Sequence, residues 1–90
     1  MKNFDVIKNF VNHAKACKGN SVTSTGDKLF SYNTIIAERI NGVMYANFTK
    51  YTQTTSKAQN NLASVLNGHA IIVEGNVPRN TQSLADFIKA

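Results

Sequence analysis

The chain has 90 residues, a mass of 9.9 kDa and a formal net charge of +5. This length predicts a single domain over residues 1–90, with a modest core and little room for a deep active-site cleft. A hydrophobic content of 42% argues against intrinsic disorder. No apolar run reaches the length of a membrane helix, the first residues lack a secretory signal, and Cys17 is the single cysteine. We therefore expect a cytoplasmic protein.

The first predicted element is an amphipathic helix over residues 3–18. Its apolar residues recur at three- and four-residue spacing: Phe4, Ile7, Phe10, Val11, Ala14 and Cys17. Asn3 is suited to cap the start of this helix, and Gly19 to end it in a left-handed conformation. On the opposite face, Lys8, Asn12 and Lys15 line up as a secondary basic face, which is either simply solvated or contacts an anionic partner.

Three antiparallel strands are predicted next, over residues 21–25, 29–40 and 43–51. Gly26-Asp27 and Asn41-Gly42 supply the two tight turns, and Asn-Gly is the strongest short hairpin signal. The second turn fixes a register in which Ile40 faces Val43 and Glu38 faces Tyr45. In this register one sheet face carries Phe30, Ile36 and the three tyrosines, Tyr32, Tyr45 and Tyr51. The other face carries Leu29, Ile35, Ala37, Ala46 and Phe48, and we assign it to the core because the alanines admit a closely packed helix.

A second helix is predicted over residues 57–67, with Ser56 to Gln59 as its capping box and Asn67-Gly68 at its end. Its apolar stripe comprises Ala58, Leu62, Val65 and Leu66. Residues 70–73 form a continuous apolar run that is typical of a strand buried on both faces. Thr81 then caps a short final helix with Leu84, Ala85, Phe87 and Ile88 directed inward. The predicted fold is α+β with the order α-β-β-β-α-β-α, an antiparallel meander packed by helices.

The sequence offers little catalytic chemistry. The five acidic residues are scattered over different elements, whereas acid–base catalysis needs a close pair with separated pKa values. His13 and Cys17 are spaced as metal ligands on a helix, but a zinc site requires three or four ligands. A small enzyme that uses His69 with Glu74 or Glu38 is the least supported class. We expect no enzyme activity, cofactor, metal or small-molecule substrate.

A Thr/Ser-rich junction precedes the second helix and is the first candidate binding site. Its residues are Lys50, Tyr51, Thr52, Thr54, Thr55, Ser56 and Lys57. The N-terminus of a helix carries a partial positive charge and N–H donors, and hydroxyls and lysines also bind phosphate oxygens. The alternative interpretation is that these residues merely cap the helix.

The tyrosine-bearing face is the second candidate. Exposed aromatic side chains on a sheet can stack on nucleobases, and tyrosine is also favoured in protein interfaces. The alternative is that the terminal helices cover this face, since a wide apolar face is seldom left bare.

Two segments carry a resemblance to a known group of proteins. Residues 30–37 read Phe-Ser-Tyr-Asn-Thr-Ile-Ile-Ala, and residues 47–59 read Asn-Phe-Thr-Lys-Tyr-Thr-Gln-Thr-Thr-Ser-Lys-Ala-Gln. Together they resemble a family of small proteins of unknown function encoded by bacteriophages and plasmids. The family pattern reads Ser-Tyr-x-Thr-x-Ile-Ala, then Asn-x-Thr-Lys-Tyr-Ser-x-Thr-Thr-Ser-Lys-His-Gln. The likeness spans residues 29–66, with Thr52 in place of serine and Ala58 in place of histidine.

The resemblance implies a viral or mobile-element setting, in which small accessory proteins act on host machinery. With the basic charge, it leads us to expect a non-enzymatic protein that binds nucleic acid or a host nucleic-acid-bound complex. Inhibition of a defence system such as a CRISPR effector is one such role. The alternative is a protein–protein module or homodimer that uses the tyrosine face without nucleic acid.

Overall fold

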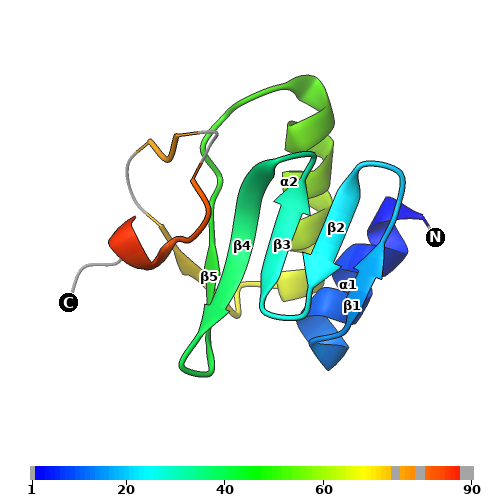
Figure 1. Ribbon diagram of the computed structural model, residues 1–90, viewed down its shortest axis with the longest axis horizontal. Coiled ribbons are helices and arrows are strands. Elements are labelled where there is room, and N and C mark those ends of the chain that lie inside the picture. The colour runs from blue at the N-terminus through cyan, green and yellow to red at the C-terminus, as the bar shows by residue number, and fades with distance from the viewer. Residues whose placement is uncertain (1, 74–75, 79–80, 88–90) are drawn as a thin grey trace.

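The computed structural model describes residues 2–73, 76–78 and 81–87. Its elements are α1 (Asn3–His13), β1 (Ala16–Lys18), β2 (Val22–Thr25), β3 (Lys28–Ser31), β4 (Thr34–Ile40), β5 (Val43–Ala46), α2 (Gln53–Leu66), β6 (Ile71–Ile72) and a 3₁₀ turn (Ala85–Phe87). The strands form one sheet in the order β1 to β6; β1 to β5 make an antiparallel meander, and β6 joins β5 in parallel. Both helices lie behind the sheet in Figure 1. The α+β class is confirmed, and the order differs from the predicted one.

Helix α1 ends earlier than the sequence predicts. It stops at His13, not Lys18, and Ala14 takes the left-handed conformation that the sequence leads us to expect at Gly19, with φ 49°. The N–H of Ala14 donates to the carbonyl of Phe10 at 3.2 Å. The chain then turns back, and residues 16–18 form the edge strand β1 instead of another helical turn.

Arg39 explains this early end. Its guanidinium donates to the carbonyl oxygens of Phe10 and Val11, at 3.0 and 3.3 Å, and lies 5.2 Å from the centroid of the Phe10 ring. Carbonyls run out of partners at the end of a helix, and Arg39 adds a second donor to the Phe10 carbonyl and supplies one to the Val11 carbonyl, which stabilises the end at that position. Asn3 does not cap the helix either, because its side chain bonds to Ser21 and accepts from the N–H of Val22.

The strand predicted over residues 29–40 is two strands. Tyr32 and Asn33 form a turn between β3 and β4, with Tyr32 at φ 53° and Ser31 paired with Thr34. Beyond this turn the predicted Asn41-Gly42 hairpin is confirmed, with Ile40 opposite Val43.

A bulge in β4 exchanges the sheet faces that the sequence predicts for Ile35 and Ile36. The register shifts between Leu29, which pairs with Ala37, and Phe30, which pairs with Ile35, so that Ile36 is an extra residue. An extra residue reverses the alternation of faces beyond it. Ile36 therefore packs under the helices with Ala37, and Ile35 packs on the outer face, the reverse of the predicted assignment.

The core has two parts. Between the helices and the sheet lie apolar residues of α1, α2 and four strands: Val6, Ile7, Phe10, Val22, Leu29, Ile36, Ala37, Ala46, Ala58, Leu62 and Leu66. The predicted burial of the two alanines and of the α2 stripe is confirmed, with Val65 at the margin. On the outer face, the C-terminal residues Val73, Val77 and Leu84 cover Ile35.

The end of the chain differs most from the prediction. β6 is an edge strand whose two isoleucines are exposed, so the expectation of a strand buried on both faces is wrong. The final helix is reduced to the turn over residues 85–87, where the Ser83 hydroxyl, and not Thr81, accepts from the N–H of Ala85. Ile88 and Glu74 lie outside the described residues. Neither helix, within the part of the chain that is described, is long and apolar enough to cross a membrane.

Gly26, which turns the chain from β2 to β3, allows a test of the early end of α1. A Cβ at Gly26 would lie 3.2 Å from the carbonyl oxygen of Ala14, and its φ of +103° disfavours any side chain. We expect Gly26→Ala to lower the free energy of unfolding by about 2 kcal/mol in urea titrations. Gly42→Ala is the matched control, since φ is +78° but no described atom lies within 4 Å, and should cost only about 1 kcal/mol. Equal losses would show that Ala14 does not approach Gly26.

Candidate functional site

Helix α2 begins one turn before the predicted capping box. Its first residue is Gln53, and the hydroxyl of Thr52 accepts from the N–H of Thr55 at 3.2 Å. Ser56 therefore lies inside the helix, and the prediction that it caps the helix is wrong. The predicted end is confirmed, since Asn67 is left-handed with φ 49°.

Gln59 does not form the predicted capping box, because its side chain bonds to the backbone that follows β5. Its amide donates to the carbonyl oxygens of Asn47 and Thr49, both at 2.9 Å. Asn47 is fully buried and donates in turn to the carbonyl of Ile35 at 2.9 Å. These bonds tie α2 to the chain that leaves β5, because each buried polar group needs a partner.

A buried hydroxyl pair brings a distant turn to the start of α2. The hydroxyls of Ser31 and Thr55 lie 3.1 Å apart, and both residues are buried. Ser31 immediately precedes the β3–β4 turn, so the backbone of this turn lies close to the first turn of α2, while the side chain of Tyr32 lines a hollow with Thr23, Phe30, Asn33 and Gln82. Tyr32 is 63% exposed, the most exposed large hydrophobic side chain among the described residues.

The three tyrosines differ in exposure, and C-terminal residues cover part of the tyrosine-bearing face, which the sequence left as one of two alternatives. Tyr32 sits in a turn, whereas Tyr45 is half-buried against the outer cluster that contains Ile35. The hydroxyl of Tyr51 donates to the carbonyl of Val77 and accepts from the side chain of Asn47. Tyr45 and Tyr51 therefore help to hold the C-terminal segment, and Tyr32 alone presents most of its surface to solvent.

We call the exposed residues around the start of α2 the α2 junction: Tyr32, Lys50, Thr52, Gln53, Thr54 and Lys57. Of the other predicted site residues, Thr55 is buried and Ser56 is half-buried, so the hydroxyl of Thr55 is not part of the surface. The first N–H groups of a helix lack partners within it. With two lysines nearby and no Asp or Glu in residues 39–73, the junction is electrostatically suited to an anion.

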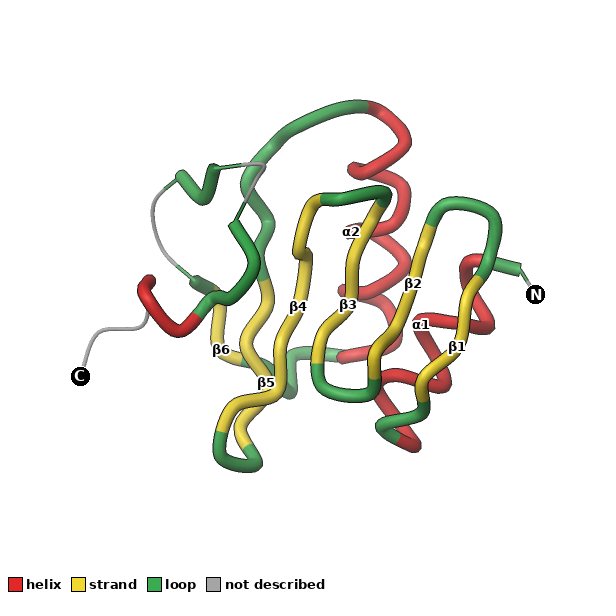
Figure 2. Tube along the Cα trace, in the orientation of Figure 1, coloured by secondary structure: helices red, strands yellow, loops and turns green. Residues whose placement is uncertain are grey.

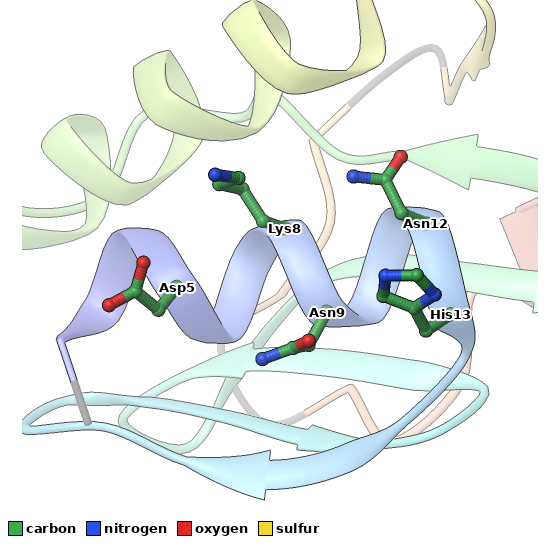
Figure 3. Close-up of a pocket in the computed structure, with 5 residues that line it drawn as sticks. All are labelled: Asp5, Lys8, Asn9, Asn12 and His13. Atoms are coloured by element: carbon green, nitrogen blue, oxygen red, sulfur yellow. The ribbon is translucent and has the colours of Figure 1, made fainter.

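The secondary basic face is divided by the early end of α1. Lys8 and Asn12 project together from α1, and with Asp5, Asn9 and His13 they line a shallow hollow of about 370 Å³ (Figure 3). Lys15 lies beyond the helix, so its predicted alignment with Lys8 and Asn12 on one helix face is wrong. Asp5 also reduces the positive charge of this surface.

Within the described residues, the candidates for metal binding and catalysis lie in separate parts of the fold. His13 ends α1 and Cys17 lies on β1, so they do not share a helix. Glu38 faces the outer cluster, whereas His69 lies on the helical side, in a pocket that also contains Arg39. Within the described residues, no group of three or more His, Cys, Asp or Glu could hold a metal ion.

The sequence did not reveal three buried polar residues. Asn47 and Gln59 stabilise the chain at the start of α2, and Glu38 binds the C-terminal segment. The carboxylate of Glu38 accepts from the N–H of Leu84 at 2.7 Å and from the hydroxyl of Ser83 at 2.9 Å. One signal was present in the sequence. Gln59 lies at helical spacing on the apolar stripe of α2, and a polar residue there implies a buried partner.

Taken together, the fold and the junction define a small basic α+β protein with both helices on one side of a six-stranded sheet. The chain belongs to a family of unknown function, DUF8033, whose family model matches residues 6–74. No curated protein and no solved structure matches the chain. The family match runs from α1 through β6, so residues of 76–78 and 81–87 that cover the outer face, such as Val77 and Leu84, lie outside it.

Proposed function

We propose that this chain is a non-enzymatic, phage-type accessory protein that binds nucleic acid, or a host complex that contains nucleic acid, through the α2 junction. The hydrogen bond between Ser31 and Thr55 carries the proposal, because it holds the turn that bears the exposed Tyr32 against the first turn of α2. A ring can stack on a base while helix N–H groups and lysines contact the phosphates on either side of it. Lys50 and Lys57 supply the cations, and both are exposed.

The resemblance to phage-encoded proteins extends the proposal to the role of the protein. A small basic protein can inhibit a nuclease-based defence complex, such as a CRISPR effector, by occupying its guide RNA or its DNA channel. The charge of +5 favours contact with nucleic acid over mimicry of DNA, which requires an acidic surface. The alternative of a protein interface on the tyrosine face loses support, since Tyr45 is half-buried against the outer cluster.

Salt dependence tests the proposal. Fluorescence anisotropy with labelled single- and double-stranded DNA and RNA at ~50 mM salt should detect binding to at least one of them. Lys50→Ala combined with Lys57→Ala should weaken that binding and reduce the slope of log affinity against log salt by about 1.5 to 2, since two phosphate contacts are lost. The exposed Lys2 and Lys18 provide the control, because their double alanine variant makes the same change in charge away from the junction.

Tyr32→Asn separates stacking from charge. Asn tolerates the left-handed backbone of this turn, so the substitution removes the ring without adding strain. Binding to the single strand should fall by about tenfold with an unchanged salt slope. If none of the four nucleic acids binds, or if both double variants lose equal affinity, the α2 junction is not a nucleic-acid site.

A further inference from the structure

The hollow on the outer face of the sheet carries two aromatic side chains. Its volume is about 300 Å³, and its lining residues are Thr23, Phe30, Tyr32, Asn33 and Gln82. Thr23 and Phe30 are paired across β2 and β3, and Tyr32 and Asn33 form the turn that follows β3. All five are described residues, and none of them has a charged side chain. The hollow is therefore suited to a planar, uncharged group and not to a phosphate.

Hydrogen bonds hold the backbone on both sides of this hollow. The N–H of Tyr32 donates to the carbonyl of Ser21 at 2.7 Å. On the C-terminal side, the ammonium group of Lys28 donates to the carbonyl of Gln82 at 2.8 Å, and the next two residues bond to the buried carboxylate of Glu38. Both walls are thus in place before a ligand arrives, which lowers the entropy cost of binding.

The backbone of Tyr32 is unfavourable for a bulky residue. Its φ of 53° lies in the left-handed region, where glycine and asparagine are less strained than tyrosine. Its side chain is 63% exposed, so packing within the chain offsets little of that cost. Strained residues of this kind are concentrated at ligand-binding and active sites. The strain and the exposure together favour a ligand-binding role for this ring.

The groups suited to an anion lie at the same end of the sheet. The hydrogen bond between Ser31 and Thr55 holds the β3–β4 turn against the first turn of α2, and Figure 2 shows the turn and the start of this helix at one end of the molecule. The exposed Lys50 and Lys57 flank that start. A nucleotide joins a planar, uncharged base to an anionic phosphate, so the hollow and the α2 junction match its two parts. A free sugar or an apolar side chain would use the hollow alone.

We propose that the hollow takes one unpaired base of a single-stranded nucleic acid whose phosphates contact the α2 junction. This inference rests on the proposed function and narrows it to strands with unpaired bases. The base stacks on the ring of Tyr32 beside that of Phe30, and the amide of Asn33 hydrogen-bonds to the edge of the base. In a duplex the neighbouring base pairs cover both faces of each base, so a duplex would have to unpair one to fill the hollow.

Uncharged nucleosides test the hollow separately from the junction. Adenosine and cytidine at millimolar concentrations should shift the NMR signals of Tyr32, Phe30 and Asn33. Neither added salt nor the combined Lys50→Ala and Lys57→Ala variant should change the Kd, because a nucleoside has no phosphate. Ribose is the matched control and should leave these signals in place, since it has no base. Equal shifts with ribose, or shifts confined to other residues, would overturn the proposal.

Oligonucleotides test whether a strand places a base there. A fully abasic strand of the same length keeps the phosphates and should bind about tenfold more weakly than the normal strand, with the same salt slope. Phe30→Leu retains apolar contact with the outer cluster but removes the ring, and it should weaken the single strand and not the duplex. Phe4→Leu is the matched control, because Phe4 is 42% exposed on α1.

The outcomes separate this proposal from the proposed function. If normal and abasic strands bind equally, or if Phe30→Leu and Phe4→Leu have the same effect, the hollow takes no base, whereas phosphate binding at the α2 junction stands. If nucleosides bind but no strand does, the hollow takes only a free nucleoside, and both the proposal and the proposed function fail.

Discussion

Asn47→Asp should lower the free energy of unfolding by about 3–5 kcal/mol, the largest loss that we expect from a single substitution in this chain. Asn47 is fully buried. Its amide nitrogen donates to the carbonyl of Ile35 at 2.9 Å and to the hydroxyl oxygen of Tyr51 at 3.0 Å. An aspartate would place a carboxylate oxygen against the Ile35 carbonyl, in a position from which water is excluded.

Urea denaturation measures this loss, and the chain offers a matched control. Asn60→Asp makes the same chemical change on the exposed side of α2 and should alter stability by no more than about 0.5 kcal/mol. Because Gln59 donates to the backbone of Asn47, Asn47→Asp should also loosen the α2 junction. The affinity for any nucleic acid that binds at the junction should then fall. Equal stability of the two variants would contradict the buried network.

Glu38→Ala should release the segment that covers the outer face of the sheet. The carboxylate of Glu38 accepts hydrogen bonds from the N–H of Leu84 and from the hydroxyl of Ser83. The Leu84 N–H is buried, so removal of its acceptor should cost about 2 kcal/mol, or about thirtyfold in the equilibrium between the docked and open segment. Lys28, which donates to the carbonyl of Gln82 at 2.8 Å, remains as a weaker attachment.

Hydrogen exchange at the amide of Leu84 reports this opening directly. Its protection should fall by about thirtyfold in Glu38→Ala, while amides of α2 such as Leu62 should keep theirs. Glu38→Gln retains an amide oxygen that can accept from Leu84 and should lose less protection. Unchanged exchange at Leu84 in the alanine variant would show that Glu38 does not secure the segment.

Both substitutions concern residues whose burial is hard to see in the sequence. Asn47 and Glu38 lie in segments that read as strands, where alternation assigns a polar residue to solvent. Their hydrogen-bond partners lie far along the chain. Gln59 donates to the carbonyl of Asn47, and Ser83 and Leu84 donate to the carboxylate of Glu38. A pattern with a period of two or 3.6 residues cannot register contacts over such distances.

The candidate site can be located from the sequence within one helical turn, but its composition cannot. The hydroxyl-rich segment indicates a helix start, and α2 does start there. Residues 52 to 55 include three threonines, each of which has a hydroxyl that could cap the helix, and tertiary packing decides which one does. Thr55 is taken by Ser31, Thr52 becomes the cap, and Thr54 remains on the surface.

The sequence by itself determined the α+β class, the Asn41-Gly42 hairpin with its register, the apolar stripe of α2 and the end of α2 at Asn67. These features rest on interactions within a few residues, which local periodicity and turn chemistry encode. The tertiary structure alone decided where α1 ends, which of Ile35 and Ile36 faces the helices, and which side chains of the α2 junction meet solvent. Each of these depends on a partner distant in the chain, namely Arg39, β3 or Ser31, whose position is set only when the sheet assembles.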